Sequence, residues 1–181
     1  FRRGVGAPLV GDSVTVQPQR EGYARIEEIL PRKNVLVRPQ AANIDRLIVV
    51  LSASAPQPDW LLADKLLIQA ALLQIEPLLV LNKCDEAHAE IRAAFLADYA
   101  AFDALCVSAK TGQGLDELRK RLNTGVSCFA GQSAVGKSSL LNALIPGLSL
   151  ETGGLSDRTE RGRHTTRHVE LLPFGAGAVL D

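Results

Sequence analysis

The sequence predicts an α/β fold: a mostly parallel sheet with helices on both faces, preceded by a small β-rich module. Residues 44–51 form an almost unbroken apolar run, which is typical of a strand buried on both faces. Beyond this run, short apolar segments alternate with segments of helical periodicity, as in sheets whose parallel strands are connected by helices. Short β-like segments before residue 40 predict the additional module.

The N-terminal module is predicted to span residues 1–39 and to be an OB-fold-like β-barrel that binds RNA. The stretches VGDSVTV, YARIEEIL and NVLV are separated by glycine, proline and charged residues, as in small barrels. Residues 1–40 hold seven lysines and arginines against four acidic residues, a net charge of +3. The pattern changes after Arg38-Pro39, so the larger domain is predicted to span residues 40–181.

The larger domain continues the alternation of strands and helices. Asp59 can cap a helix in which Leu62, Leu66, Ala70 and Leu73 recur at helical spacing. Because ligands of parallel sheets bind at the carboxyl ends of the strands, functional residues are expected in the loops that follow strands. Further helices are predicted at 86–99, at 115–122 and from residue 137, and further strands at 78–81, 105–107, 126–130, 169–172 and 178–180.

Composition argues against several other classes of protein. Hydrophobic residues make up 46% of the chain, but no run reaches the roughly 20 apolar residues of a membrane span. The N-terminus lacks the pattern of a secretory signal, so we expect a cytoplasmic location and no membrane contact. Twenty basic and twenty acidic residues cancel, so the overall charge does not indicate a nucleic-acid partner. Cys84, Cys106 and Cys128 lie far apart among apolar neighbours and are expected to be core thiols.

A glycine-rich loop follows the predicted strand at 126–130 and fits the pattern GxxxxGK[ST]. Its backbone N–H groups can hold phosphate oxygens, Lys137 can reach the β- and γ-phosphates, and the Ser138 hydroxyl can bind Mg²⁺. A turn that only caps a helix is the alternative, but such a turn would not need Lys137 and Ser138 together. The predicted nucleotide-binding residues are Gly131, Gln132, Ser133, Ala134, Val135, Gly136, Lys137, Ser138 and Ser139.

A second loop, which follows the predicted strand at 78–81, matches the NKxD motif of GTPases with Asn82, Lys83, Cys84 and Asp85. The Asp85 carboxylate can accept hydrogen bonds from both N1 and the 2-amino group of guanine. Adenine offers neither donor, and mismatches that leave buried polar groups unpaired are rejected by roughly 10⁴ to 10⁵. Taken alone, the tetrapeptide fits an ordinary strand-to-helix turn better.

A third loop strengthens the guanine hypothesis. Ser108, Ala109 and Lys110 resemble the SAK element of GTPases, whose backbone contacts guanine O6 while the lysine lies beside the base. This loop follows the NKxD loop by one strand and one helix, which predicts that the two form one guanine pocket. GTPases usually have the phosphate loop first, whereas here it comes third. The order is circularly permuted, and the site survives because sheet position sets where loops meet.

With a β module before a permuted GTPase domain, residues 9–181 resemble the RsgA-type ribosome small-subunit-dependent GTPases. The resemblance implies that GTP is hydrolysed to GDP with Mg²⁺ during maturation of the small ribosomal subunit, which activates the reaction. It also implies that the N-terminal OB-fold contacts rRNA, so the partners are the small subunit and its rRNA. The family's C-terminal zinc-binding domain has no counterpart in this sequence, and we expect a monomer. At Ala134 the family usually has glycine, so nucleotide affinity or turnover is expected to differ.

The resemblance also assigns a metal site. Ser138 is expected to hold Mg²⁺ together with Thr166, or else Thr165, although adjacent threonines also suit the start of a strand. Asp181 follows the last predicted strand and is expected to be the aspartate of a DxxG motif, at which the domain is predicted to be truncated. We expect it to hold Mg²⁺ through water.

The catalytic residues expected of this site are Lys137, Thr166 and His164. His164 can orient the attacking water, since a neutral imidazole accepts a proton, but it also fits a solvated loop histidine. A nucleotide-gated RNA-binding module with incidental hydrolysis is the alternative function.

Overall fold

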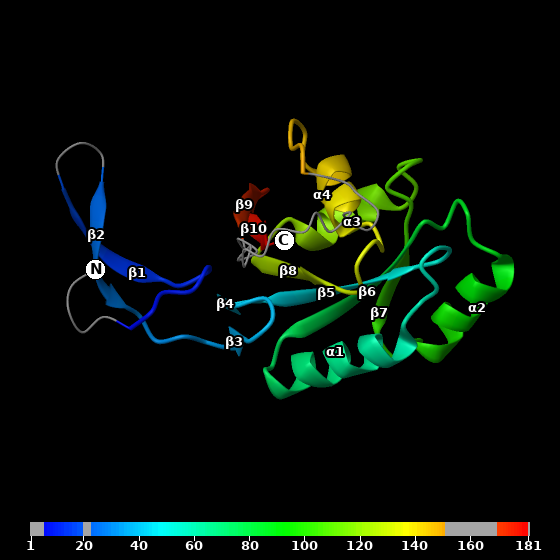
Figure 1. The fold of residues 1–181 in the computed structure, drawn as a ribbon, viewed down its shortest axis with the longest axis horizontal. Coiled ribbons are helices and arrows are strands. Elements are labelled where there is room, and N and C mark those ends of the chain that lie inside the picture. The colour runs from blue at the N-terminus through cyan, green and yellow to red at the C-terminus, as the bar shows by residue number, and fades with distance from the viewer. Residues whose placement is uncertain (1–5, 20–22, 151–169, 181) are drawn as a thin grey trace, which may run out of the picture.

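A six-stranded sheet forms the centre of the molecule (Figure 1). The computed structural model describes residues 6–19, 23–150 and 170–180. In these ranges the strand order is β7-β6-β5-β8-β10-β9, and all neighbours run parallel except β9, which is antiparallel to β10. The strands are β5 (Arg46–Ser52), β6 (Glu76–Asn82), β7 (Asp103–Cys106), β8 (Val126–Ala130), β9 (Leu171–Phe174) and β10 (Gly177–Leu180).

Helices cover both faces of this sheet, which confirms the predicted α/β architecture. α1 (Trp60–Leu72) and α2 (Ala89–Asp98) lie on one face, and α3 (Leu115–Leu122) and α4 (Lys137–Leu144) lie on the other (Figure 1). None of the helices in the described ranges has the length and apolar character needed to cross a membrane.

The central strand β5 explains why the sheet needs helices on both sides. Its last six residues are all buried. Side chains alternate along a strand, so Leu47, Val49 and Leu51 pack in the cluster that contains α1, while Ile48 and Val50 pack in the cluster that contains α3 and α4. The unbroken apolar run is therefore explained by burial of the strand on both faces, as predicted.

The N-terminal part lies to one side of the sheet (Figure 1). β1 (Val14–Pro18) and β2 (Ala24–Ile29) form an antiparallel hairpin whose register shifts between Thr15 and Val16. β3 (Val35–Leu36) and β4 (Ala41–Ala42) form a second two-stranded sheet. β3 precedes the predicted domain boundary at residue 39, and β4 follows it. A closed OB-fold-like barrel and a boundary at residue 39 stay predictions.

Polar side chains attach this part to the central sheet. The buried amide of Asn34 donates to the carbonyl of Ile44 at 2.8 Å and accepts from the N–H of Ile44 at 2.9 Å. Lys33 forms an ion pair with Asp45, whose other carboxylate oxygen accepts from the N–H of Val126 at 2.8 Å. These contacts connect β3 to the starts of β5 and β8.

Several boundaries differ from the prediction by two or three residues. α2 begins at Ala89, because residues 83–86 form a turn in which the N–H of Glu86 donates to the carbonyl of Lys83 at 3.0 Å. The first strand of the final hairpin spans 171–174, because the register pairs Phe174 with Gly177 around a tight turn. The α3 helix and the β8 strand have the predicted bounds.

Removal of the cap at the start of α1 should destabilise the protein. The Asp59 carboxylate accepts from the N–H of Leu62 at 2.9 Å. Asp59→Ala is therefore expected to lower the free energy of unfolding by about 1 kcal/mol in urea titrations. Lys65→Ala, on the exposed side of the same helix, is the control. Equal effects of the two substitutions would contradict the capping role.

Candidate functional site

The loops that follow β5, β6, β7 and β8 meet at the carboxyl ends of these strands, where a parallel sheet is expected to bind ligands. The loops after β6, β7 and β8 carry the three motifs described above. The strand order places β8 next to β5 and two positions from β6, so the permuted chain brings the motifs to one edge.

The side chain of Asn82 joins these three loops. Its amide nitrogen donates to the carbonyl of Val135 in the phosphate loop at 3.0 Å, and its amide oxygen accepts from the N–H of Ala109 at 3.2 Å. Asn82 is only 1% exposed, so both ends of its amide need protein partners. The NKxD, SAK and phosphate loops therefore lie together, as the sequence predicted.

Lys83 makes a second connection between the loops. Its backbone has a φ of 63°, in the left-handed region. Its ammonium group donates to the carbonyl of Ala134 at 2.9 Å and also to the carbonyl of Ala55, in the loop after β5. One lysine thus fixes the phosphate loop against two neighbouring loops.

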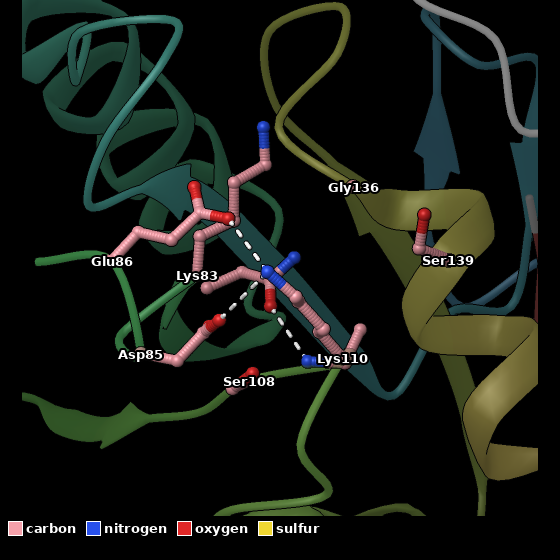
Figure 2. A pocket seen from close by; sticks show the side chains of 9 residues that line it. Lys83, Asp85, Glu86, Ser108, Lys110, Gly136 and Ser139 are labelled. Atoms are coloured by element: carbon pink, nitrogen blue, oxygen red, sulfur yellow. Dashed lines mark hydrogen bonds and ion pairs between the residues drawn. The ribbon is translucent and has the colours of Figure 1, made fainter.

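A pocket of about 280 Å³ opens between these loops. Figure 2 shows Asp85, Ser108 and Lys110 on one side and the start of α4 on the other. Eight of the nine lining residues belong to the predicted nucleotide-binding set, and the ninth is Glu86. The nine are Asn82, Lys83, Asp85, Glu86, Ser108, Ala109, Lys110, Gly136 and Ser139.

Glu86 is the pocket residue that the sequence analysis missed. Its carboxylate accepts from the Ser54 hydroxyl at 3.0 Å. It also accepts from the Lys110 ammonium group at 3.4 Å (Figure 2). Glu86 therefore connects the loop after β5 to the SAK loop. Its position directly after Asp85 was the only signal in the sequence.

The Asp85 carboxylate is held in its ionised form. The Ser108 hydroxyl hydrogen-bonds to it and lowers its pKa, and the backbone N–H of Asp85 and the nearby charge of Lys110 act in the same direction, against the opposing effect of burial. The Lys110 nitrogen lies 3.8 Å from the carboxylate. The side chain of Asp85 is 15% exposed, so the pocket contains a charged acceptor that is largely covered by its neighbours.

The phosphate loop depends on two glycines. Gly131 has a φ of +145°, and a Cβ there would lie 2.2 Å from the carbonyl oxygen of Val50. Gly136 has a φ of +96°, and a Cβ there would lie 2.4 Å from the amide nitrogen of Asn82. Any side chain at either position would therefore displace the loop from its neighbours.

The other residues of the phosphate loop have separate roles in its structure. Ala134 adopts a φ of 64°, a conformation that favours glycine. Val135 is buried in the core beside α4. The Lys137 ammonium group donates to the carbonyls of Gly131 at 3.1 Å and Gln132 at 2.9 Å, so it lies inside the curve of the loop.

The donor set of this loop fits a phosphate group and Mg²⁺. The loop leads into the N-terminus of α4, where backbone N–H groups and the helix dipole favour an anion. Ser138, in the first turn of α4, carries a hydroxyl oxygen of the hard type that Mg²⁺ prefers. Four of the predicted metal and catalytic residues lie outside the described residues and stay predictions: His164, Thr165, Thr166 and Asp181.

The sequence profile of the RsgA GTPase family matches residues 29–181. This chain belongs to the RsgA GTPase family. Proteins named small ribosomal subunit biogenesis GTPase RsgA are similar to it over its whole length. The one from Halalkalibacterium halodurans is 44% identical over 186 residues, and the one from Caldanaerobacter subterraneus subsp. tengcongensis is 45% identical over 186 residues.

Solved structures of RsgA relatives share the fold. YjeQ from Thermotoga maritima matches 97% of this chain with a TM-score of 0.80 and 36% identity. YloQ, described as a circularly permuted GTPase, matches 100% of it with a TM-score of 0.74 and 32% identity. The predicted permuted GTPase fold is therefore confirmed. The chain spans 63% and 62% of the two bacterial RsgA relatives above, and 60% and 58% of the two solved chains.

Loss of the Ser108 hydroxyl should raise the pKa of Asp85. The folded-state pKa lies below the ordinary value of about 3.9, so the ionised carboxylate stabilises the fold above that pH. This contribution is lost as the pH falls through the lowered pKa. Carbon-13 NMR titration should show an upward shift in Ser108→Ala. Ser54→Ala, which removes a hydroxyl bound to Glu86, should leave the Asp85 pKa unchanged. An unshifted pKa in Ser108→Ala would refute this cause.

Proposed function

We propose that this protein binds GTP, hydrolyses it to GDP and phosphate, and acts in the maturation of the small ribosomal subunit, which activates hydrolysis. The observation that carries the proposal is the contact between the base loop and the phosphate loop. Asn82 and Lys83 hydrogen-bond directly to the carbonyls of Val135 and Ala134. A single nucleotide can therefore be held at its base and at its phosphates.

Guanine is the base that the pocket suits best. The ionised Asp85 carboxylate accepts the N1 and 2-amino hydrogens of guanine, while adenine would leave it without a donor. Lys83 and Lys110 line the same pocket as Asp85 (Figure 2). The backbone N–H of Ala109 is already used by Asn82, so the remaining backbone of the SAK loop is proposed to contact guanine O6.

The phosphate end supplies positioning and charge. Lys137 and the loop N–H groups bind the β- and γ-phosphates, with Ser138 and Thr166, or else Thr165, as Mg²⁺ ligands and Asp181 bound through water. Mg²⁺ neutralises charge on the transferring phosphoryl group when bound. His164 is proposed to orient the attacking water, and Ala134 to alter nucleotide affinity or turnover.

The ribosomal role is supported by the relatives, which are named as small ribosomal subunit biogenesis GTPases. The N-terminal module is proposed to contact rRNA, since residues 1–40 carry a net charge of +3. Its hairpin projects away from the central sheet, which leaves it accessible to a large partner (Figure 1). A cytoplasmic location follows from this role.

Asp85→Asn should remove guanine preference. The substitution replaces a charged acceptor of two hydrogen bonds, each worth about 1.5–3 kcal/mol, so GDP should bind at least 100-fold more weakly. Isothermal titration with GDP and ADP measures both affinities. Asp116→Asn is the matched control, because its carboxylate is 93% exposed on α3. Unchanged GDP affinity in Asp85→Asn, or ADP binding as tight as GDP binding in the unmodified protein, would contradict the guanine assignment.

Small ribosomal subunits should accelerate hydrolysis by the full-length protein. Lys137→Ala should lower the single-turnover rate by about 100-fold or more, since it removes a donor to the transferring phosphate. Lys120→Ala, on the exposed face of α3, is the control. If subunits bind in a GTP-dependent way without any acceleration, the protein is instead a nucleotide-gated RNA-binding module.

A further inference from the structure

The thiols of Cys84 and Cys106 lie side by side, and both residues are close in sequence to residues that line the pocket. The register of β6 and β7 pairs Leu81 with Cys106. The carbonyl of Leu81 accepts both from the N–H of Val107 at 2.8 Å and from the thiol of Cys84 at 3.1 Å. The N–H of Cys84 in turn donates to the carbonyl of Val107 at 3.0 Å. Cys84 is thus held against the peptide that follows Cys106, and both side chains belong to the same hydrophobic cluster.

The two cysteines differ in reactivity. When Cys106 is ionised, the Cys84 thiol donates to it instead of to the Leu81 carbonyl. This hydrogen bond lowers the pKa of Cys106 to about 7, with help from the charge of Arg92 on α2 and against the effect of burial. The same interaction, together with burial, raises the pKa of Cys84. Cys106 is partly exposed, while Cys84 is 3% exposed. Near neutral pH, Cys106 is therefore the thiolate that an oxidant can reach, and Cys84 is a protonated thiol beside it.

We propose that Cys84 and Cys106 form an oxidation site, at which hydroperoxides produce a disulfide that weakens binding of guanine nucleotides. The Cys106 thiolate attacks the terminal oxygen of the hydroperoxide, and the O–O bond breaks. The alkoxide or hydroxide leaves and is protonated to an alcohol or water, while Cys106 becomes a sulfenic acid. The Cys84 sulfur then attacks the Cys106 sulfur. The S–S bond forms, the S–O bond breaks, and the proton of Cys84 leaves with the hydroxide as water.

The effect on the pocket follows from the positions of the two cysteines. Cys84 precedes Asp85 directly, and Cys106 precedes Ser108 by two residues. The hydrogen bond from Ser108 holds the Asp85 carboxylate, and this bond spans the two loops that the disulfide would draw together. Because a disulfide restricts the separation and orientation of the two residues that it joins, its formation is expected to change how these loops are placed relative to each other. This part of the inference rests on the proposed guanine site, whereas formation of the disulfide does not.

The test uses the full-length protein treated with hydrogen peroxide near neutral pH. Peptide mapping by mass spectrometry without reduction should find a peptide that links Cys84 to Cys106. The buried Cys128 should remain reduced and serves as the internal control. Affinity for a fluorescent GDP analogue should fall by at least about tenfold, as for loss of one hydrogen bond to a charged group, and recover with dithiothreitol.

Variants separate the possible outcomes. Cys106→Ser and Cys106→Ala should bind the analogue normally and lose the response to peroxide, while Cys128→Ala should keep it. If all thiols stay free, or if the disulfide forms and affinity stays within about twofold of the reduced value, the proposal is wrong. If the reduced protein does not bind the analogue, the guanine assignment fails, and peptide mapping still decides whether the oxidation site exists.

Discussion

The buried amide of Asn82 is the constraint on which the rest of the site depends. A buried amide without partners costs about 1–3 kcal/mol for each unsatisfied group, so the phosphate loop and the SAK loop must stay where its two hydrogen bonds reach. The partners lie 53 and 27 residues away along the chain. Asn82 itself is fixed by β6, whose register pairs it with Ser52 at the end of β5. The sheet therefore positions the amide, and the amide positions the loops.

This arrangement explains why the permuted chain order leaves the geometry intact. The position of each motif is set by the carboxyl end of one strand and by contacts with neighbouring loops. These two determinants do not depend on the order in which the strands occur along the chain. β8 pairs with β5 on one side and with β10 on the other. The phosphate loop follows β8, and only β5 lies between β8 and β6. The side chain of Asn82, at the end of β6, therefore reaches the carbonyl of Val135 in the phosphate loop.

The sequence predicts most of the sheet and most of the pocket, because both follow from local patterns. The apolar run of β5, the amphipathic helix α3 and the glycine-rich loop before α4 each carry their own signal. Contacts between distant segments carry no such signal. The bonds from Glu86 to Ser54 and Lys110, the amide of Asn34 on Ile44, and the pairing of Cys84 with Cys106 depend on tertiary packing. These features become visible only when the strands are placed side by side.

Lys83 shows how the two ends of the pocket are coupled. Ala134 has a φ of 64°, which costs a residue with a Cβ roughly 1–2 kcal/mol relative to glycine. The Lys83 ammonium group bonds to the carbonyl of that same residue at 2.9 Å, and a hydrogen bond from a charged donor offsets a cost of this size. A residue of the base loop therefore helps to keep the phosphate loop in its strained shape. Because Lys83 also lines the base pocket, a change in its position alters both ends of the site together.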